Sequence, residues 1–392
     1  MKILIASDSF IYQTSGVANV VIALAEGLRQ RGNEVKVLAL SNDMHSRREG
    51  DHYFIRSAKS FVYPDVRIDF VTHHPLLTEL KEWRPDIIHL HTEGSVARMA
   101  YHLARETGAP LVMTTHTDYA HYIFGRYRSK RPVQKLMTGW GKLVYRRAAK
   151  VIAPSEKAKR FIQLKSVRDR TVVIPNGIPV EHYQKPVSAE EKASLFQKAG
   201  FKDNGNTLVM VTRLSKEKNI AEILQYMPAL LEKNPRAQLI LVGDGPDRER
   251  LEEITRREGL EGHVRFMGRI PPEEVYRYYA MGDVFVSAST FEVHSLSYLE
   301  AMACGLPLVC REDDCLLGVL EDGENGRIYR TEEEYVDAVT EILQHPELRD
   351  CMRMNALRRI QEFSEDRFVD NTCALYRETL AEKDCQAAEK RV

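Results

Sequence analysis

The sequence lacks a long hydrophobic run, because none of its apolar stretches approaches the ~20 residues that a helix needs to span a bilayer. The opening stretch Met1–Ala6 is shorter than the core of a signal peptide, and Asp8 follows it without a cleavage pattern of small residues. We therefore expect a cytoplasmic protein that begins with a short strand.

Cysteine is scarce, and all six cysteines lie in the second half of the chain, at positions 304, 310, 315, 351, 373 and 385. No two of them have the Cys-x2-Cys spacing that is typical of zinc sites, so we expect reduced structural thiols, no disulfides and no metal site. The sequence also has no P-loop motif, no G-x-S-x-G elbow and no complete dinucleotide fingerprint. These absences disfavour P-loop NTPases, standard NAD enzymes and hydrolases with a serine elbow.

Net charge is absent as well, since 56 Lys and Arg balance 56 Asp and Glu. The balance conceals an asymmetry. Residues 1–180 contain 28 basic and 16 acidic residues, whereas residues 181–392 contain 28 and 40. The basic half is expected to face something anionic, a nucleic acid or a membrane surface, and the overall balance argues against a general polyanion binder.

The chain does have the length and composition of a packed protein of two domains, with 392 residues, 43% of them hydrophobic. Strands are expected at 2–7, 34–40, 86–91, 110–115 and 150–153, and, after a polar stretch from 178 to about 206, at 207–211, 238–242, 264–266, 284–287 and 306–309. Helices near 219–232, 247–258, 272–280 and 295–303 separate the later strands.

This alternation of strands and helices predicts an α/β fold of two doubly wound domains, at 1–180 and 181–365. A charged helix at 366–392 is expected to cross back to the first domain. Because such sheets bind ligands at the carboxyl ends of their strands, we expect the active site in a cleft between the domains.

Candidate site residues of the second half surround two strand-to-helix junctions. Arg213 and Lys218 follow one strand, where a guanidinium fork and a point charge suit two adjacent phosphates; a solvated basic loop is the alternative. Glu292 falls in a later loop before a helix whose N-terminus can hold an anion. Glu300 lies on that helix among apolar residues, so it needs hydrogen-bond donors, which sugar hydroxyls would provide unless it is a partly exposed helix glutamate.

In the first half, Gly16 closes the loop Thr14-Ser15-Gly16 between a strand and a helix, where a diphosphate can approach backbone amides. His116 stands at the carboxyl end of a strand. His89 and His91 alternate along the neighbouring strand, so one is expected in the core and the other near the cleft. For each histidine, a structural role is the alternative.

Residues 119–155 combine nine Lys and Arg with many aromatic residues and no Asp or Glu. Such a pattern on a helix is typical of a segment that lies on anionic lipid headgroups, where each basic side chain contributes roughly 1 kcal/mol. A solvated basic face over a core helix is the alternative. A single-strand nucleic-acid site is disfavoured, because no known binding module is present.

Together these motifs resemble the retaining GT-B glycosyltransferases, the large family that includes sucrose synthase, mannosyltransferases and bacterial lipid glucosyltransferases. The resemblance covers nearly the whole chain, through the segments Ser15–Val17, Val172–Gly177, Thr212–Lys218, Leu241–Pro246, Val264–Gly268 and Glu292–Pro307. The segments His116–Ile123 and Ser295–Glu300 are most similar to those of diacylglycerol glucosyltransferases.

The resemblance implies a GT-B fold, two Rossmann-like domains that face one another across a cleft, and a set of roles. Gly16, Arg213 and Lys218 would hold the nucleotide diphosphate, Glu300 the ribose, Gly268 and Ile270 the base, Glu292 with the backbone of His294, Ser295 and Leu296 the sugar, and His116 the reacting face. In one departure, Ser295 stands where the family usually has glycine, and His294 where it often has Gln or Phe. The β-carbon of Ser295 would crowd the sugar pocket.

The implied activity is that of a hexosyltransferase that moves glucose from UDP-glucose, with retention, to a membrane lipid such as 1,2-diacylglycerol at the inner face of the cell membrane. Attack would occur on the side from which the diphosphate departs, and protein cations, without a metal or another cofactor, would neutralise it. A glycosyltransferase with a soluble acceptor and a nucleotide-sugar 2-epimerase are the alternatives. The donor sugar, the linkage and the oligomeric state stay open.

Overall fold

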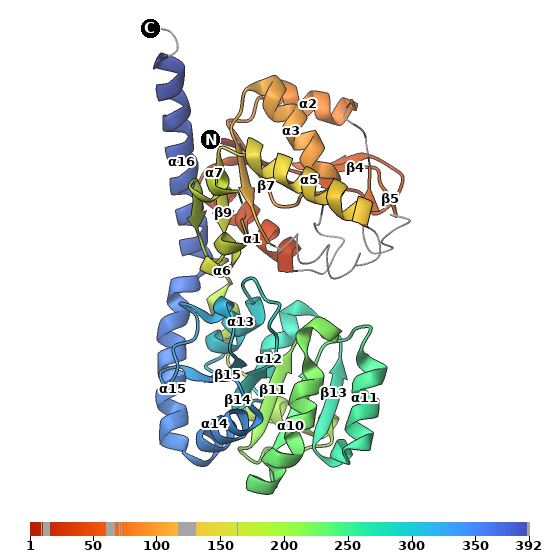
Figure 1. Cartoon of the computed structure of the whole chain (residues 1–392), viewed down its shortest axis with the longest axis vertical. Coiled ribbons are helices and arrows are strands. Elements are labelled where there is room, and N and C mark those ends of the chain that lie inside the picture. Colours follow the sequence, from red (N-terminus) through yellow and green to blue (C-terminus); the bar gives the residue numbers. More distant parts are fainter. Residues whose placement is uncertain are drawn as a thin grey trace. The chain divides into compact units, whose positions relative to one another are not determined.

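The computed structural model describes residues 1–8, 10, 16–59, 67–69, 71, 73–116, 131–162 and 164–389. The chain divides into two compact units (Figure 1). The first unit combines Met1–Gly177 with Glu365–Val392, and the second is Ile178–Ser364. The sequence had placed the corresponding boundaries after residues 180 and 365.

The first unit is built on an eight-stranded sheet in the order β10-β9-β8-β7-β1-β2-β4-β3, in which β3 and β4 are antiparallel and the other neighbours are parallel. Its strands are β1 (Lys2–Ser7), β2 (Glu34–Leu40), β3 (Arg47–Glu49), β4 (His52–Ile55), β7 (Ile87–Leu90), β8 (Leu111–Thr114), β9 (Lys150–Ala153) and β10 (Thr171–Val173), and a separate pair joins β5 (Ala58–Lys59) to β6 (Arg67–Ile68).

Helices cover both faces of this sheet. They are α1 (Gly16–Gln30), α2 (Pro75–Trp83), α3 (Ser95–Thr107), α5 (Arg131–Arg147), α6 (Glu156–Phe161), α7 (Lys165–Arg168) and α16 (Glu365–Glu389). Figure 1 shows α2, α3 and α5 gathered on one side of the first unit, where their apolar residues join the strands in one buried cluster. Burial on both faces explains why Ile3–Ala6 of β1 is a continuous apolar run rather than an alternating one.

The C-terminal helix α16 packs on the first unit. The backbones of α1 and α16 approach closely, since a β-carbon at Gly27 would lie 2.6 Å from a methyl carbon of Val369. Arg31, after α1, pairs with Asp366 and Asp370, and Lys150 Nζ lies 2.8 Å from Glu378. Residues from the two ends of the sequence therefore share one core.

The second unit has a six-stranded parallel sheet in the order β13-β12-β11-β14-β15-β16. Its strands are β11 (Thr207–Val211), β12 (Gln238–Val242), β13 (Val264–Gly268), β14 (Val284–Ser287), β15 (Leu308–Arg311) and β16 (Gly326–Tyr329). Its helices are α8 (Val180–Tyr183), α9 (Ala189–Ala199), α10 (Ile220–Lys233), α11 (Arg248–Arg257), α12 (Val275–Tyr279), α13 (Leu296–Ala303), α14 (Glu332–Gln344) and α15 (Pro346–Arg359).

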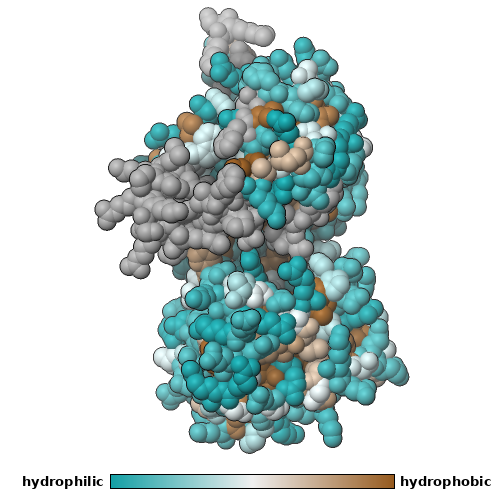
Figure 2. Space-filling model, turned by 90° about the vertical axis from the view of Figure 1, so that its right-hand side faces the viewer, coloured by the Kyte–Doolittle hydropathy of each residue, from teal (hydrophilic) through white to brown (hydrophobic). Residues whose placement is uncertain are grey.

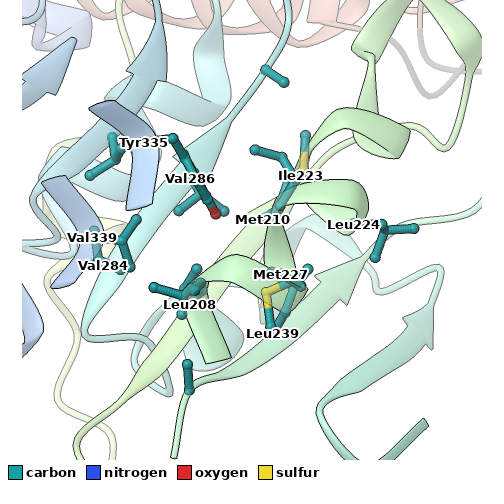
Figure 3. Packing of buried hydrophobic residues seen from close by; sticks show 14 of the residues in the cluster. Leu208, Met210, Ile223, Leu224, Met227, Leu239, Val284, Val286, Tyr335 and Val339 are labelled. Atoms are coloured by element: carbon teal, nitrogen blue, oxygen red, sulfur yellow. The ribbon is translucent and has the colours of Figure 1, made fainter. Parts of the chain in front are cut away.

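Each strand of the second sheet sends alternate side chains into two separate cores. On β11, Leu208 and Met210 join the cluster beneath α10 and α14, whereas Val209 joins the cluster on the opposite face. Figure 3 shows the first cluster, with Met227 of α10 and Val339 of α14 packed against the strands. The period of two along a strand thus buries both faces of the sheet.

Two glycines, Gly243 and Gly245, let the loops after β11 and β12 lie directly against each other. Leu214 N–H donates to the carbonyl of Asp244 at 3.1 Å, and Gly243 N–H donates to the carbonyl of Gly268 at 2.9 Å. A β-carbon at Gly243 would lie 1.9 Å from the carbonyl oxygen of Thr212, and Gly243 has a φ of +133°. These glycines therefore serve the packing of the loops that lead to Arg213.

We expect Gly243→Ala to lower the free energy of unfolding by about 3 kcal/mol or more, because the new methyl group meets backbone at a left-handed φ. Gly259→Ala is the matched control, since Gly259 also has a positive φ, of +66°, but has open space around it. It should lose only about 1 to 2 kcal/mol. Denaturant titration measures both, and equal losses would show that the contact with Thr212 carries no cost.

The sequence missed several elements of the second half. It predicted only a polar stretch at 178–206, whereas α9 forms there. A capping box between Ser188 and Glu191 stabilises the N-terminus of this helix. Strand β15 begins two residues later than predicted, at Leu308, and β16, α14 and α15 were not predicted individually. Thr331 caps the N-terminus of α14, and its hydroxyl accepts a hydrogen bond from Glu334 N–H.

Among the described residues, no helix has both the length and the hydrophobicity that crossing a membrane requires. On the face drawn in Figure 2, hydrophobic side chains occur as scattered patches among hydrophilic ones.

Candidate active site

Arg213, Lys218 and Glu292 of the second unit, and Gly16 of the first, follow the strands at which the strand order reverses. In the second unit β11 continues to β12 on one side and pairs with β14 on the other, so the loops after β11 and β14 are neighbours. In the first unit the same holds for β1, which pairs with β2 and β7. Open α/β sheets bind ligands at such points.

Lys218 and Glu292 come together at the switch point of the second unit. Lys218 Nζ donates to Glu292 Oε1, and both side chains are partly buried. Arg213 is exposed, and within the described part of the chain its side chain has no ion pair. The structure thus brings a cation and a carboxylate of the predicted set into contact and leaves a second cation, Arg213, on the same loop.

Helix α13 begins beside this pair, with Ser295 as its N-cap. Ser295 makes no capping hydrogen bond, and its hydroxyl instead lies 3.0 Å from that of Ser297. The first amides of α13, from Leu296 onward, therefore lack a side-chain cap and can serve an anion. Ser295 has a φ of −79°, so the backbone at this position does not require glycine.

His294, next to this helix, has an imidazole with unusual surroundings. Neither ring nitrogen has a hydrogen-bond partner within the described residues, although both are buried. Its ring centroid lies 5.9 Å from that of Phe363. Burial lowers the pKa of His294 to about 4, so the ring is neutral near pH 7.

Glu300 lies on α13 and is held by two tyrosines that sequence reasoning missed. Tyr279 donates its hydroxyl to Glu300 Oε2 at 2.8 Å, and Tyr183 also hydrogen-bonds the carboxyl group. Burial raises the pKa of Glu300, and both hydroxyls oppose this shift. The sequence predicts sugar hydroxyls as the hydrogen-bond donors to Glu300, whereas the protein itself provides two tyrosine hydroxyls. The role of Glu300 towards a ribose stays a prediction.

The predicted base-binding turn follows the edge strand β13. Gly268 has a φ of +73°, and its carbonyl accepts the hydrogen bond from Gly243, which ties the turn to the loop after β12. Ile270 packs against the buried cluster beneath α13. This turn is separated from the switch point by β12 and β11 in the sheet order.

In the first unit, three histidines gather at the carboxyl ends of β7 and β8. Nδ1 of His91 lies 3.0 Å from Nε2 of His116, and the ring of His89 lies 4.1 Å from that of His91. His89 and His91 are both buried, so the prediction that only one of them lies in the core is wrong; residues two apart on a strand share a face. His116 is partly exposed. Burial lowers the pKa of His116 to about 4 and that of His91 well below its usual value.

Asp8, directly after β1, caps the N-terminus of α3 through hydrogen bonds from backbone amides. It accepts hydrogen bonds from the amides of Gly94, at 3.1 Å, and Val96, at 3.0 Å, and from the hydroxyl of Thr92 at 2.6 Å. Burial raises the pKa of Asp8 and these donors lower it. The N-terminus of α3 is therefore occupied by a protein carboxylate, which the sequence did not predict. Gly16, the first residue of α1, is exposed; Thr14 and Ser15 lie outside the described residues.

Glu93 is a second carboxyl group that the sequence reasoning missed. It is 8% exposed, and it accepts a hydrogen bond from Tyr145 Oη at 2.5 Å, while its backbone carbonyl accepts one from Trp140 Nε1 at 2.6 Å. Burial raises the pKa of Glu93 to about 7. Glu93 thus attaches α5 to the loop after β7. A lone glutamate in a loop carries no sequence signal for this contact.

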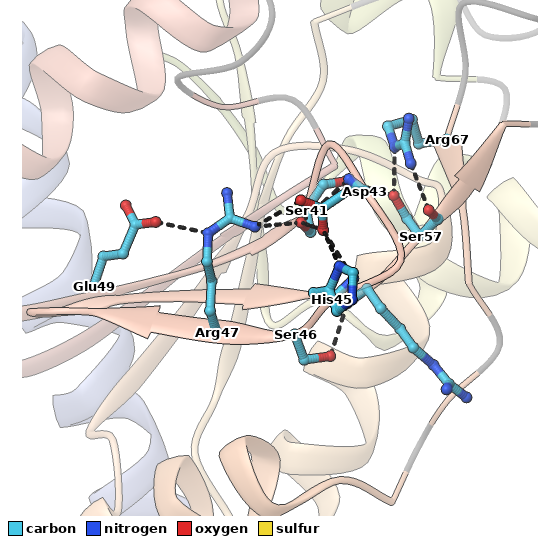
Figure 4. Close-up of polar contacts among 9 residues, drawn as sticks. Ser41, Asp43, His45, Ser46, Arg47, Glu49, Ser57 and Arg67 are labelled. Atoms are coloured by element: carbon cyan, nitrogen blue, oxygen red, sulfur yellow. Dashed lines mark hydrogen bonds and ion pairs between the residues drawn. The ribbon is translucent and has the colours of Figure 1, made fainter.

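Polar side chains hold the loops after β2 and β4 together (Figure 4). Ser57 Oγ donates to the carbonyl of Ser41 at 2.5 Å, and Arg67 Nε donates to Ser57 Oγ at 2.6 Å. Arg47 Nη1 donates to Ser41 Oγ at 2.7 Å and also approaches Asp43. These contacts stabilise the carboxyl edge of the sheet on the far side of β1 from the histidines.

The described part of the basic segment 119–155 begins at Arg131; residues 119–130 lie outside the described residues. In the second half of α5, Trp140 and Tyr145 pack towards the core and Lys142 and Arg146 are exposed. Here the two aromatic residues pack against the core and hydrogen-bond Glu93, and the basic residues form the outer face of the helix. Binding of this segment to a membrane stays a prediction. Within the described residues, no three His, Cys, Asp or Glu side chains form a group that could hold a metal ion.

Comparison with known proteins decides the family. The model of "Glycosyltransferase Family 4" matches residues 14–182, and that of "Glycosyl transferases group 1" matches residues 191–359. The alpha-monoglucosyldiacylglycerol synthase of Streptococcus pneumoniae is 30% identical over 401 residues, covering 98% of this chain and 89% of that protein. The chain belongs to the glycosyltransferases. This chain is also 28% identical over 393 residues to the alpha-monoglucosyldiacylglycerol synthase of Acholeplasma laidlawii, covering 96% of each of the two chains.

The fold of this glycosyltransferase also matches solved structures. Anabaena HepE in complex with UDP has a TM-score of 0.76 at 20% identity, covering 96% of this chain and all of that one. With two Rossmann-like sheets, the enzyme has the GT-B fold. The predictions of family, fold and enzyme class are therefore confirmed, and those for the individual site residues are not tested by these comparisons.

Proposed function

We propose that this glycosyltransferase moves a hexose, glucose from UDP-glucose, to the hydroxyl of a membrane lipid such as 1,2-diacylglycerol, with retention of the anomeric configuration. The similarity to two alpha-monoglucosyldiacylglycerol synthases, over nearly the full length of the chain, carries this proposal. Solved neighbours that contain UDP and UDP-glucose support the choice of donor.

The groups of the second unit suit the donor. Arg213, Lys218 and the uncapped amides of α13 would neutralise the diphosphate as it departs, which is the kind of stabilisation that contributes several kcal/mol per donor group. Glu292 would release Lys218 and accept a sugar hydroxyl when the diphosphate takes its place. The acceptor hydroxyl would attack from the side of the leaving phosphate, which takes its proton, so no protein nucleophile is needed.

The basic outer face of α5 would place the enzyme on an anionic leaflet at the inner face of the cell membrane. Lys142 and Arg146 are exposed there, and each could contribute about 1 kcal/mol of attraction to anionic lipid. A peripheral enzyme of this kind reaches a lipid acceptor without a membrane-spanning helix.

Incubation with radiolabelled UDP-glucose and diacylglycerol in vesicles tests the proposal. We expect label in the organic phase, and more of it as the fraction of anionic lipid rises. Vesicle flotation serves as the second measurement, because an enzyme with a soluble acceptor needs no anionic lipid. Label that stays in the aqueous phase across a panel of UDP, GDP and ADP sugars would refute lipid transfer, and an isomerised free sugar would indicate an epimerase.

A further inference from the structure

The hydrogen bond between His91 and His116 has two possible directions. A neutral imidazole carries one N–H and one bare nitrogen. Either His91 Nδ1–H donates to His116 Nε2, or His116 Nε2–H donates to His91 Nδ1, across the same 3.0 Å. If His91 donates, Nδ1 of His116 carries a proton and can donate a hydrogen bond. If His116 donates, its Nδ1 is bare and can only accept one.

The surroundings of His91 distinguish these directions. Its Nε2 atom is buried and has no hydrogen-bond partner within the described residues. If His116 donated, this atom would be a buried N–H without an acceptor; if His91 donates, it is a bare lone pair. Orphaned buried N–H groups are rarer in proteins than unsatisfied acceptors. The first direction, in which His91 donates, is therefore favoured, and it places the single proton of His116 on Nδ1.

The pair is also held in place and lacks a counter-charge. His89 is anchored at both nitrogens, by Tyr376 Oη at 2.5 Å and by Thr114 Oγ1 at 2.7 Å, and its ring lies against His91. The planes of the His91 and His116 rings lie within 17° of each other with centroids 5.2 Å apart, so the rings meet edge to edge, as an N–H···N bond requires. Neither ring forms an ion pair with a carboxylate of the described residues. Burial without a counter-charge keeps both rings neutral near pH 7.

We propose that His91 is a positioning residue that fixes His116 as the Nδ1–H tautomer, so that His116 donates a hydrogen bond to an oxygen of the substrate, from a hydroxyl or a phosphate group. His116 is then a neutral donor and not a general base. The inference rests on the proposed function only in taking UDP-glucose as the substrate.

Nitrogen NMR of the full chain labelled with ¹⁵N-histidine tests the tautomer without any assay of activity. His116→Gln and His91→Asn assign the two rings by the signals that disappear. We expect a protonated Nδ1 and a bare Nε2 for both rings at pH 7.5. A protonated Nε2 on His116 would overturn the proposal, and this result would stand whether or not the enzyme transfers sugar to lipid.

The same signals identify the oxygen. If Nδ1–H of His116 donates to a phosphate, UDP alone should shift its resonance; if it donates to a hydroxyl, only UDP-glucose or the lipid acceptor should do so. The absence of a shift with all three would contradict the donor role.

Two variants at position 91 test the positioning role. The amide N–H of asparagine in His91→Asn can replace Nδ1–H, whereas His91→Leu has no donor. We expect His91→Leu to lower kcat about 10- to 100-fold, as is seen for outer partners of metal-bound histidines, with little change in KM for UDP-glucose. His91→Asn should retain most of the activity. Equal loss in both, at matched melting temperatures, would show that the side chain only fills space, and full activity of His91→Leu would reject the role. If His91→Leu does not fold, the NMR result decides.

Discussion

In Arg213→Ala, kcat for sugar transfer should fall about 100- to 1000-fold, the cost of removing one preorganised group that stabilises developing negative charge. The side chain is exposed and has no ion pair within the described residues, so its loss leaves no unpaired partner. The melting temperature should therefore stay within about a degree, as is usual for surface positions. Arg256→Ala, at an exposed position of α11, is the matched control and should retain full activity.

Lys218→Ala should lower kcat by a similar factor, but with a different effect on stability. Lys218 pairs with the partly buried Glu292, whose carboxylate would lose its partner. We expect a loss of about 1 kcal/mol that Lys218→Arg largely restores. Lys202→Ala, at an exposed position of the same unit, is the control. If both Arg213→Ala and Lys218→Ala turn over within threefold of the parent enzyme, the phosphate role of these cations is wrong.

Glu93→Gln should make the stability of the enzyme less dependent on pH. A carboxyl group whose pKa rises from 4.5 in the unfolded chain to about 7 in the folded enzyme binds protons more tightly when folded. Its contribution is fully present below about pH 4.5 and is lost as the pH rises through about 7. Ionised Glu93 then costs up to about 3 kcal/mol, since one pKa unit corresponds to about 1.4 kcal/mol.

Thermal unfolding between pH 5 and pH 8.5 measures this effect. Relative to the parent enzyme, Glu93→Gln should gain up to about 5 to 10 °C at pH 8.5 and much less at pH 5. The amide oxygen still accepts the hydrogen bond from Tyr145, so the variant changes the charge and retains the contact. Glu82→Gln, at an exposed position of α2, should show no such dependence on pH. A pH-independent difference between Glu93→Gln and the parent would mean that Glu93 does not titrate in this range.

The class of fold and the places of the candidate loops could be predicted from the sequence. Strand and helix periods are local properties, and in a parallel sheet the loops that follow neighbouring strands meet at one edge, which brings Lys218 to Glu292. The strand predictions at 207–211, 238–242 and 284–287 agree with β11, β12 and β14. Boundaries set by packing, such as that of β15, were less accurate.

The partners of the buried polar groups could not be predicted in this way. Glu300 is held by Tyr183 and Tyr279, and His89 is bonded to Tyr376, which is 287 residues away in the sequence. Such pairs leave no periodic signal. The aromatic residues of α5 show the same limit, because Trp140 and Tyr145 read as interfacial residues in the sequence but bind Glu93 in the structure.

The sequence by itself determined that this protein is a glycosyltransferase of two α/β units, and which loops carry its cations and carboxylates. Only the tertiary structure decided which buried carboxyl and imidazole groups are paired and which partners they have. The physical reason is that apolar periodicity is a property of each segment by itself. The protonation of a buried group depends instead on desolvation and on hydrogen-bond donors from segments that are distant in the sequence.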